Sequence, residues 1–453
     1  MSEWKKVKIG EFLKQYRITI YVDDAQQYRQ VTISSKDGVK YRCTKIGKEI
    51  GRKRQFLIDL KKYPNTVIFT RQGLHEGSIG LAPEEVDSCI ATENMPMFSV
   101  DDTVIDTQYL KNLLRSPIFA NLVSTLTPTG SAQKSIHERD LLPLEISIPN
   151  LETQKKIVKE ISSQLEMTEL LSSEIEKQKS YAKQLRQNIL QEAIEGKLTA
   201  DWRKQHPVQK GNPDYDAQAL FDKIQSEKKL SKSNIRSSNN IQEKIDGDFV
   251  LDIPQSWLFV NLSELGDLER GKSKHRPRND IRLFSNGKYP FVQTGDVSQS
   301  KYYGYEIQPA SKFYNDFGLA QSKMWKAGTL CITIAANIAE TGFLTYDACF
   351  PDSVVGFTPY IDGDFSNFVR YYIDSIKVIL EKYAPATAQK NINLGILETL
   401  KIPLPPLAEQ KEIVARVEQH IQTITQLETQ IATRETTTKQ LMQSILKDAF
   451  EED

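Results

Sequence analysis

Apolar residues recur every three or four positions along residues 151–197. They fall at Ile157, Ile161, Leu165, Leu171, Ile175, Leu185, Ile189 and Ala193. These spacings keep them on one face of a helix, while Lys, Glu, Gln and Ser fill the other positions. No proline lies between Glu152 and Glu195, so nothing breaks the helix. The pattern predicts one helix of roughly 60 Å, at ~1.5 Å for each of about 40 residues.

A second stretch, residues 407–453, repeats the first. Gln154 matches Gln410, and 410 − 154 = 256. The same offset holds without a gap from Ala132 to Lys197, which identifies an internal duplication. The matching apolar residues are Ile413, Val417, Ile421, Leu427, Ile431, Leu441, Ile445 and Ala449.

Each narrow apolar stripe on so long a helix requires a partner, and the duplicate is the obvious one. We therefore predict that the two helices form an intramolecular antiparallel coiled coil. The alternative is two separate helices, each packed on its own domain. Long apolar repeats without caps favour the coiled coil.

Two globular modules precede the two helices. Module 1 spans residues 1–150 and module 2 spans 254–406, with a polar, partly flexible connector at 198–253 in which only ALFDKIQSEKKL indicates a helix. Trp257 matches Trp4, and strand-like runs such as NTVIFT and VVGFTPYI alternate with Gly-containing loops. Each module also has one helix, LKNLLRSPIFANLV or SNFVRYYIDSIKVILEKY. The predicted fold class is α+β: two duplicated mixed α/β modules, each with a mixed sheet, joined by two long antiparallel helices.

The two modules share this frame but differ almost completely in their loops. A duplicated scaffold with unlike loops is suited to binding two different targets at a fixed separation, since identical targets would not require the loops to differ.

Charge gives no global sign of a nucleic-acid or membrane partner. The 453 residues include 59 basic and 59 acidic side chains, for a net charge of +0. A DNA-binding protein of this composition would need its charge sorted locally, or partners that help to enclose the DNA.

The cysteines and the start of the chain indicate a reducing, cytoplasmic location. The 4 cysteines have no CxxC spacing, which favours free or buried thiols over metal ligands. We find no signal peptide and no run near 18 apolar residues, so we expect no membrane contact.

Residues Gly266 to Ser273 fit the pattern of a phosphate-binding P-loop. That chemistry needs a strand before the glycine-rich loop and a helix after it. Here LSEL before the match looks helical, and Pro277 follows too closely for a clean first helical turn. We interpret the match as accidental.

Two clusters of basic residues are better candidates for a binding surface, because Arg and Lys displace counterions from DNA phosphates. The alternative is that both clusters are simply solvated loops. In module 2 the cluster comprises Arg270, Lys272, Lys274, His275, Arg276, Arg278 and Arg282, with Asp280 as the one acid. In module 1 it comprises Arg42, Lys45, Lys48, Arg52, Lys53, Arg54, Arg71 and His75.

Amide side chains near these clusters could pair with base edges. The candidates are Gln72, Gln293 and Asn337. The tripeptide Ala-Gln-Lys also follows a Thr- and Pro-containing loop in both modules, placing Gln133 and Lys134 opposite Gln389 and Lys390. It is either a structural helix start or a shared backbone or phosphate contact.

The sequence contains no complete catalytic motif, only two partial matches. Asn212-Pro213-Asp214-Tyr215 is close to the Asn/Asp-Pro-Pro-Tyr/Phe motif of amino-methyltransferases, but it lies in the polar connector without a glycine-rich cofactor loop upstream. Pro351-Asp352 begins like a nuclease motif, yet no acid-x-Lys follows at a useful spacing.

Over essentially its whole length the chain resembles the specificity subunits of type I DNA restriction–modification systems. The paired segments IPNLETQKKI and PLPPLAEQKEI, the tails QLRQNILQEAIEGKL and QLMQSILKDAF, and the connector GKLTADWR carry the resemblance. One position departs from the repeated pattern: the first copy has Thr153 where the second copy has Glu409.

The resemblance implies that each module is a target-recognition domain for one half of a bipartite asymmetric site on double-stranded DNA. The helices would set the spacer and dock two methyltransferase subunits, which would bring S-adenosylmethionine; motor–nuclease subunits using ATP and Mg²⁺ could join. The chain itself would hold no cofactor or metal and would not be an enzyme. The rival hypotheses are a self-contained DNA-modifying enzyme, disfavoured by the absent motifs, and a coiled-coil scaffold without DNA contact, disfavoured by the basic loops.

Overall fold

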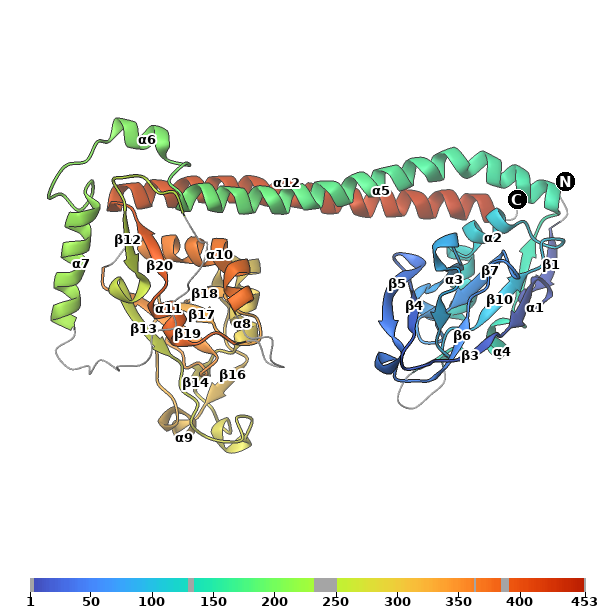
Figure 1. Cartoon of the computed structure of the whole chain (residues 1–453), viewed down its shortest axis with the longest axis horizontal. Helices are drawn as coiled ribbons and strands as arrows, with labels where there is room; N and C mark the ends of the chain where they lie inside the picture. The colour runs from blue at the N-terminus through green and yellow to red at the C-terminus, as the bar shows by residue number, and fades with distance from the viewer. Residues whose placement is uncertain (1–3, 129–133, 232–250, 362–363, 384–390, 452–453) are drawn as a thin grey trace. The chain divides into compact units, whose positions relative to one another are not determined.

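A computed structural model describes residues 4–128, 134–231, 251–361, 364–383 and 391–451 (Figure 1). The chain divides into two compact units. Unit 1 comprises Met1–Gln178 with Gln430–Asp453, and unit 2 comprises Lys179–Thr429. Each unit therefore contains one module together with a part of both long helices.

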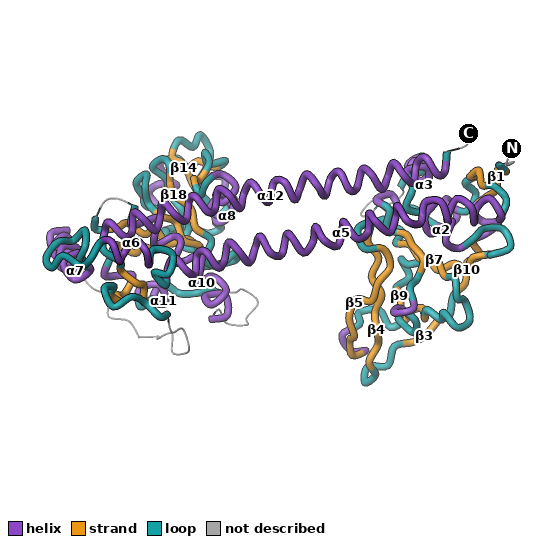
Figure 2. Tube along the Cα trace, turned by 90° about the horizontal axis from the view of Figure 1, so that it is seen from above, coloured by secondary structure: helices purple, strands orange, loops and turns teal. Residues whose placement is uncertain are grey.

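The two long helices are α5 (Leu151–Ile194) and α12 (Leu407–Phe450) (Figure 2). In unit 1 the first part of α5 shares a core with the end of α12, through Ile161 and Leu446. In unit 2 the end of α5 shares a core with the start of α12, through Ile189 and Ile413. The helices are therefore antiparallel, and the predicted packing of the two copies is confirmed.

Buried residues seven positions apart line the packed face of each helix. In α5 they are Thr168, Ile175, Ala182 and Ile189; in α12 they include Ile424, Ile431 and Thr438. Thr168 matches Ile424 and Ala182 matches Thr438 under the 256-residue offset. A seven-residue repeat is the coiled-coil pattern, and small residues let the helices approach closely.

Four leucines that we assigned to this buried face lie outside it. The exposed fractions are 42% for Leu171, 44% for Leu185, 42% for Leu427 and 48% for Leu441. Each lies three positions after a buried small or branched residue, so it projects from the flank of the packed face. The prediction was wrong here because hydrophobicity alone ranks Leu above Thr and Ala.

Both long helices start in the same way. The side chain of Gln154 donates to the carbonyl of Pro149 at 2.8 Å, and that of Gln410 donates to the carbonyl of Pro405 at 2.7 Å. Both glutamines are buried. The duplicated glutamine therefore fixes the angle between each helix and the segment before it, which explains the Pro-to-Gln spacing in both copies.

Module 1 begins with β1 (Lys5–Lys8) and α1 (Ile9–Phe12), and β1 pairs with β11 (Glu145–Ile148). Its main sheet has the order β2-β10-β7-β8, formed by Leu13–Tyr16, Met97–Val100, Thr66–Phe69 and Ile79–Leu81. Helices α2 (Thr107–Leu113), α3 (Pro117–Ser124) and α4 (Glu138–Leu141) complete the frame. The main core of unit 1 joins this frame to both long helices.

We predicted one helix over LKNLLRSPIFANLV, but the structure has two. Pro117 cannot donate a backbone hydrogen bond, and it occupies the first position of α3. The hydroxyl of Ser116 accepts from the backbone N–H of Phe119 at 3.3 Å and caps this new start.

A second sheet, of order β3-β6-β9-β4-β5, extends module 1. Its strands are Thr19–Tyr21, Arg54–Leu57, Ile90–Ala91, Gln27–Ser34 and Gly38–Ile46. The β4–β9 pair is parallel and the other pairs are antiparallel, so this sheet is mixed as predicted.

Module 2 repeats the frame with different additions. Strand β12 (Leu258–Asn261) pairs with β20 (Lys401–Leu404), and α10 (Phe365–Tyr383) and α11 (Leu394–Glu398) pack on the core. The main sheet has the order β13-β19-β17-β18-β15, formed by Gly266–Arg270, Val354–Pro359, Leu330–Thr333, Thr341–Leu344 and Glu306–Ile307.

In place of the second sheet, module 2 carries a two-stranded ribbon of β14 (Tyr289–Phe291) and β16 (Lys312–Tyr314), with α8 (Thr294–Gln299) and α9 (Asp316–Ala320). The ribbon has a small core of its own, built on Leu283, Phe291 and Tyr314. The additions to the shared frame thus differ between the modules in fold as well as in sequence.

The described part of the connector is more ordered than we expected. It forms α7 (Ala217–Ser231), which contains the predicted helix, and also α6 (Ala200–Gln205). Leu220 and Ile224 of α7 are fully buried in the core of unit 2. The carbonyls of Pro213 and Asp214 accept from the first backbone N–H groups of α12, at 3.2 and 3.1 Å. The segment that resembled a methyltransferase motif therefore caps a helix.

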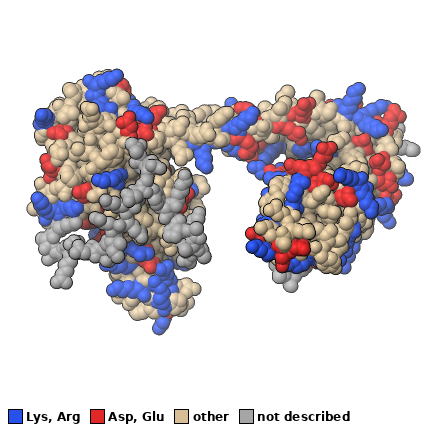
Figure 3. Space-filling model, in the orientation of Figure 1, with Lys and Arg blue, Asp and Glu red and all other residues tan. Residues whose placement is uncertain are grey.

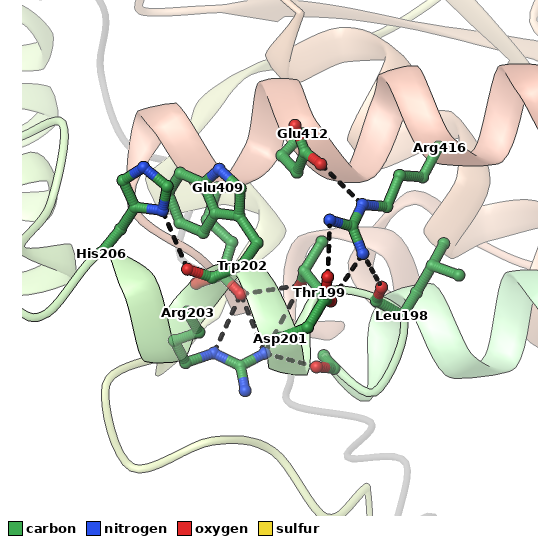
Figure 4. A network of polar contacts seen from close by, with 10 residues as sticks. Leu198, Thr199, Asp201, Trp202, Arg203, His206, Glu409, Glu412 and Arg416 are labelled. Atoms are coloured by element: carbon green, nitrogen blue, oxygen red, sulfur yellow. Dashed lines mark hydrogen bonds and ion pairs between the residues drawn. The ribbon is translucent and has the colours of Figure 1, made fainter.

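A network of polar contacts also fastens the connector to α12 (Figure 4). Glu409, which is 1% exposed, accepts hydrogen bonds from Thr199 at 2.8 Å, Arg203 at 2.9 Å and the indole of Trp257 at 2.8 Å. Two turns further along the helix, Arg416 binds Asp201 at 2.6 Å and donates to the carbonyl of Leu198 at 2.9 Å. Thr153, the counterpart of Glu409, cannot form such a network.

Candidate nucleic-acid interface

Basic side chains gather at one end of unit 2. Figure 3 shows lysine and arginine over the part where Figure 1 draws β14, β16 and α9. The predicted segment 270–282, here called the basic loop, runs from the end of β13 into the short 3₁₀ helix η5 (Ile281–Leu283). Arg276, Arg278 and Arg282 have side chains that are 56%, 50% and 70% exposed.

Asp280 organises the end of the basic loop. Its carboxylate accepts from the guanidinium of Arg282 and from Nε2 of His275, each at 2.7 Å. The hydrogen bonds from Arg282 hold the pKa of Asp280 well below its usual value. The loop therefore keeps a defined shape, and the positive charge of Arg282 is partly neutralised by Asp280.

Asp352 holds the middle of the loop. It forms an ion pair with Arg278 at 2.6 Å, while Arg276 donates to the carbonyl of His275 at 2.9 Å. Arg270 likewise donates to the backbone carbonyl of Asp352 at its own end of the loop. Lys272 and Lys274 are exposed beside these anchored side chains. The structure thus brings the predicted basic residues of module 2 together on one loop.

The formal P-loop match has a different structure from a phosphate loop. Its first five residues form β13, which pairs with β19 along its whole length. A Cβ atom at Gly271 would lie 2.1 Å from the carbonyl oxygen of Pro351, and one at Gly266 would lie 2.5 Å from that of Thr358. Both glycines therefore serve close backbone packing, and the interpretation as an accidental match is supported.

The predicted amides of module 2 lie around α8. Gln293 immediately precedes this helix, and Asn337 donates from Nδ2 to the hydroxyl of Ser298 within it at 3.3 Å. Among the hydrogen bonds of the described residues, none joins either amide to the basic loop.

In module 1, Arg42 occupies a β-bulge. Gln30 pairs with Cys43 and Val31 pairs with Tyr41, so Arg42 is the extra residue on β5. Bulges redirect side chains and are frequent beside functional sites. Strand β5 is also an edge of its sheet, and Lys45 lies three residues further along the same strand.

A second basic group of module 1 lies near the opposite edge of that sheet. Arg54 lies on β6 directly across from Tyr21, whose side chain is 76% exposed. Lys53 forms an ion pair with Asp24, and Arg52 lies 3.4 Å from Glu93. Strands β9 and β4 separate this group from Arg42, so the structure does not unite the basic residues of module 1 in one cluster.

Arg71 differs from the other predicted residues because it is mostly buried. It makes two hydrogen bonds to Glu138, at 3.0 and 2.8 Å, and its side chain is 15% exposed. Its geometry is that of a structural ion pair between the loop after β7 and α4. Gln72 and His75 are exposed in the same loop, where His75 lies 3.7 Å from Glu76.

The duplicated Ala-Gln-Lys segment is only partly visible. Lys134 is exposed at the start of a described range. Gln133, Gln389 and Lys390 lie outside the described residues.

The sequence prediction missed two lysines at the basic end of unit 2. Lys288 immediately precedes β14, and Lys312 lies on β16 with its ammonium group 5.8 Å from the centre of the Phe284 ring. Each is isolated in the sequence, and only the pairing of β14 with β16 places them on one ribbon with the basic loop.

In the described ranges of the chain, no group of three His, Cys, Asp or Glu side chains has an arrangement that could hold a metal ion. None of the helices in those ranges has the length and apolar character that a membrane crossing requires.

Comparison with known proteins places the chain in a family. The family model described as the type I restriction modification DNA specificity domain matches residues 1–178 and 254–434. The chain is 24% identical over 355 residues to the type I restriction enzyme EcoDI specificity subunit of Escherichia coli, covering 78% of this chain and 71% of that protein. It is 23% identical over 434 residues to the MjaX specificity subunit of Methanocaldococcus jannaschii, covering 92% and 89%.

A solved structure supports the same fold. It comes from work on complex assembly and conformational transition of the type I R-M system, and it aligns with a TM-score of 0.56 at 20% identity over 99% of this chain and 98% of the other. The family match covers both modules and the first part of each long helix, to residue 178 in α5 and to residue 434 in α12. We conclude that this chain belongs to the family of type I restriction modification DNA specificity proteins.

Proposed function

We propose that the two modules act as target-recognition domains, each reading one half of a bipartite asymmetric site on double-stranded DNA. The observation that carries this proposal is the unlike additions on a duplicated frame: a five-stranded sheet in module 1 and a two-stranded ribbon in module 2. Both additions present Arg and Lys side chains, which suit phosphate contact.

The long helices set the number of untouched base pairs between the two half-sites. Their seven-residue repeat of buried positions gives a rod of defined length, and the fixed starts at Gln154 and Gln410 tie each module to it.

The same helices dock two methyltransferase subunits. The four exposed leucines support this part of the proposal, because the duplication relates them in pairs: Leu171 to Leu427 and Leu185 to Leu441. Unit 1 holds Leu171 and Leu441, and unit 2 holds Leu185 and Leu427. Each unit therefore offers one example of each leucine, which suits one copy of the same partner per unit.

Catalysis belongs to the partners in this proposal. The methyltransferase subunits supply S-adenosylmethionine chemistry on adenine, and motor–nuclease subunits supply the chemistry that uses ATP and Mg²⁺. The chain contributes sequence recognition and assembly, and no catalytic step.

The test is a genome-wide map of methylated adenines in cells that carry this chain with its cognate methyltransferase subunit. We expect a bipartite motif with a fixed gap that disappears when the chain is deleted. Methylation that is unchanged by the deletion would leave the chain as a scaffold without a role in sequence choice.

A further inference from the structure

Ile281 is the most exposed aliphatic side chain among the described residues of module 2, at 75%. It is the first residue of η5, whose last residue, Leu283, is 1% exposed and anchors the turn in the small core of the ribbon. The turn thus buries one apolar side chain and directs another outward. A single exposed apolar residue is common on proteins, so its surroundings decide its meaning.

The turn that presents Ile281 is held on both sides. Asp280 accepts from the backbone N–H of Arg282 at 2.9 Å, and the Asn315 side chain donates to the carbonyls of Arg282 at 3.0 Å and Ser285 at 2.9 Å. The backbone N–H of Phe284 closes the turn on the carbonyl of Ile281 at 3.0 Å. Because the turn is already fixed, little conformational entropy is lost when a partner binds there.

The sequence and contacts around Ile281 are strongly basic. Six Arg and Lys residues occur between Arg270 and Arg282, with Asp280 as the acid in that segment and Asp352 paired beside it. Such a surface is complementary to DNA phosphates. The apolar group that base edges offer in the major groove is the 5-methyl group of thymine. We infer that Ile281 contacts a thymine methyl group within the half-site that module 2 reads, an inference that rests on the proposed function.

Two other exposed apolar side chains of module 2 lie outside the basic loop, beside lysines that are paired with an acid. Tyr302 is 70% exposed, but the neighbouring Lys301 lies 3.7 Å from Glu340. Val378 on α10 is 49% exposed, and the adjacent Lys377 is paired with the same glutamate at 2.5 Å. Val378 is therefore a suitable control: a branched aliphatic residue of the same module, outside the basic loop.

The experiment uses the full chain in complex with its cognate methyltransferase subunit and duplexes that carry the mapped motif. Each thymine of both half-sites is replaced in turn by deoxyuridine, which removes only the 5-methyl group. We expect one replacement, in one half-site, to weaken binding about fourfold, the loss typical of one buried methyl group. Ile281→Ala should weaken binding to the thymine duplex by a similar factor and should abolish the response to that replacement. Val378→Ala should leave both affinities unchanged.

Three results would overturn the inference. Ile281→Ala could leave both affinities unchanged, it could weaken the thymine and deoxyuridine duplexes by the same factor and so retain the full response to deoxyuridine, or the motif could contain no A·T pair. If no motif depends on the chain at all, the proposed function fails first, so the two failures are distinguishable.

Discussion

Glu409 is the residue on which the attachment of the connector depends. It is buried, and its two oxygens accept hydrogen bonds from three side chains in two segments of the chain: Thr199 and Arg203 at α6, and Trp257 before β12. Removal of its charge leaves the half-buried Arg203, whose side chain is 22% exposed, without its counterion. Because breaking a buried ion pair is costly, we expect Glu409→Gln to lower the free energy of unfolding of unit 2 by about 3 kcal/mol. Denaturant unfolding followed by tryptophan fluorescence measures this change.

Glu412 provides the matched control one turn away. Its side chain is 30% exposed and pairs with Arg416 on the same helix at 2.6 Å. Glu412→Gln should cost less than about 1 kcal/mol, as partly exposed ion pairs four residues apart on one helix do. Equal losses for the two variants would contradict a special role for the buried network.

Glu138 predicts a dependence of stability on pH. Burial opposes ionisation of its carboxyl group, but the hydrogen bond from Arg71 and the attraction to its charge prevail, and the pKa falls from 4.5 to about 2. A depressed pKa adds stability that is complete above pH 4.5 and is lost as the pH falls toward about 2. The melting temperature of Glu138→Gln should therefore lie below that of the unaltered chain at pH 7, and the gap should narrow below pH 4.5. A gap that stays constant down to the acid limit of folding would refute this account.

Lys274 tests phosphate contact by the basic loop. It is exposed, whereas Arg276, Arg278 and Arg282 are each engaged with the protein. Lys274→Ala should weaken binding of the assembled complex to all DNA sequences and reduce the slope of log K against log salt by about 0.9. Lys223→Ala on α7 removes the same charge from an exposed position of the connector and should leave the slope unchanged. Equal slopes of log K against log salt for both variants would show that Lys274 makes no phosphate contact.

At the scale of elements, the long helices were predictable because their pattern extends over 44 residues in each copy. Which residues of these helices are buried was harder to predict. Thr168 and Ala182 are buried while Leu171 and Leu185 are exposed, since close approach of two helices favours small side chains that hydrophobicity scales rank low. The assignment of Arg71 to DNA contact has a similar cause. Its ion-pair partner Glu138 lies 67 positions away in the sequence, so the sequence alone gives no sign that Arg71 is already paired.

Helix length offers a direct test of the spacer. Four residues inserted after Gln178 in α5 and after Thr429 in α12, where the units divide, lengthen the pair by ~6 Å and rotate it by about 40°. One base pair adds ~3.4 Å and about 34°. We therefore expect methylation mapping to give a spacer longer by one or two base pairs and unchanged half-sites.

A control variant replaces four residues at each of these points with the inserted sequence, without a change in length. It should keep the original spacer. Altered half-sites in the longer variant would show that the helices do more than separate the modules.

At the scale of the whole molecule, the duplication made the architecture predictable: two frames, two helices and their mutual packing follow from one repeated pattern. The elements added to each frame could not be predicted from that pattern. The sheet of module 1 and the ribbon of module 2 depend on pairings such as Tyr21 with Arg54 and Phe291 with Lys312, which no local pattern specifies. Basic residues could therefore be selected by type, but their grouping on one loop or on opposite sheet edges required coordinates.

The antiparallel packing of two copies of one helix has an evolutionary consequence. A protein of half this length, with one module and one such helix, could pair with a second copy of itself about a twofold axis. With two identical modules, that ancestor would have recognised a palindrome. Under the proposed function, fusion of two such copies would let each module change alone, so that an asymmetric DNA target could replace the palindrome while the two helices kept their pairing.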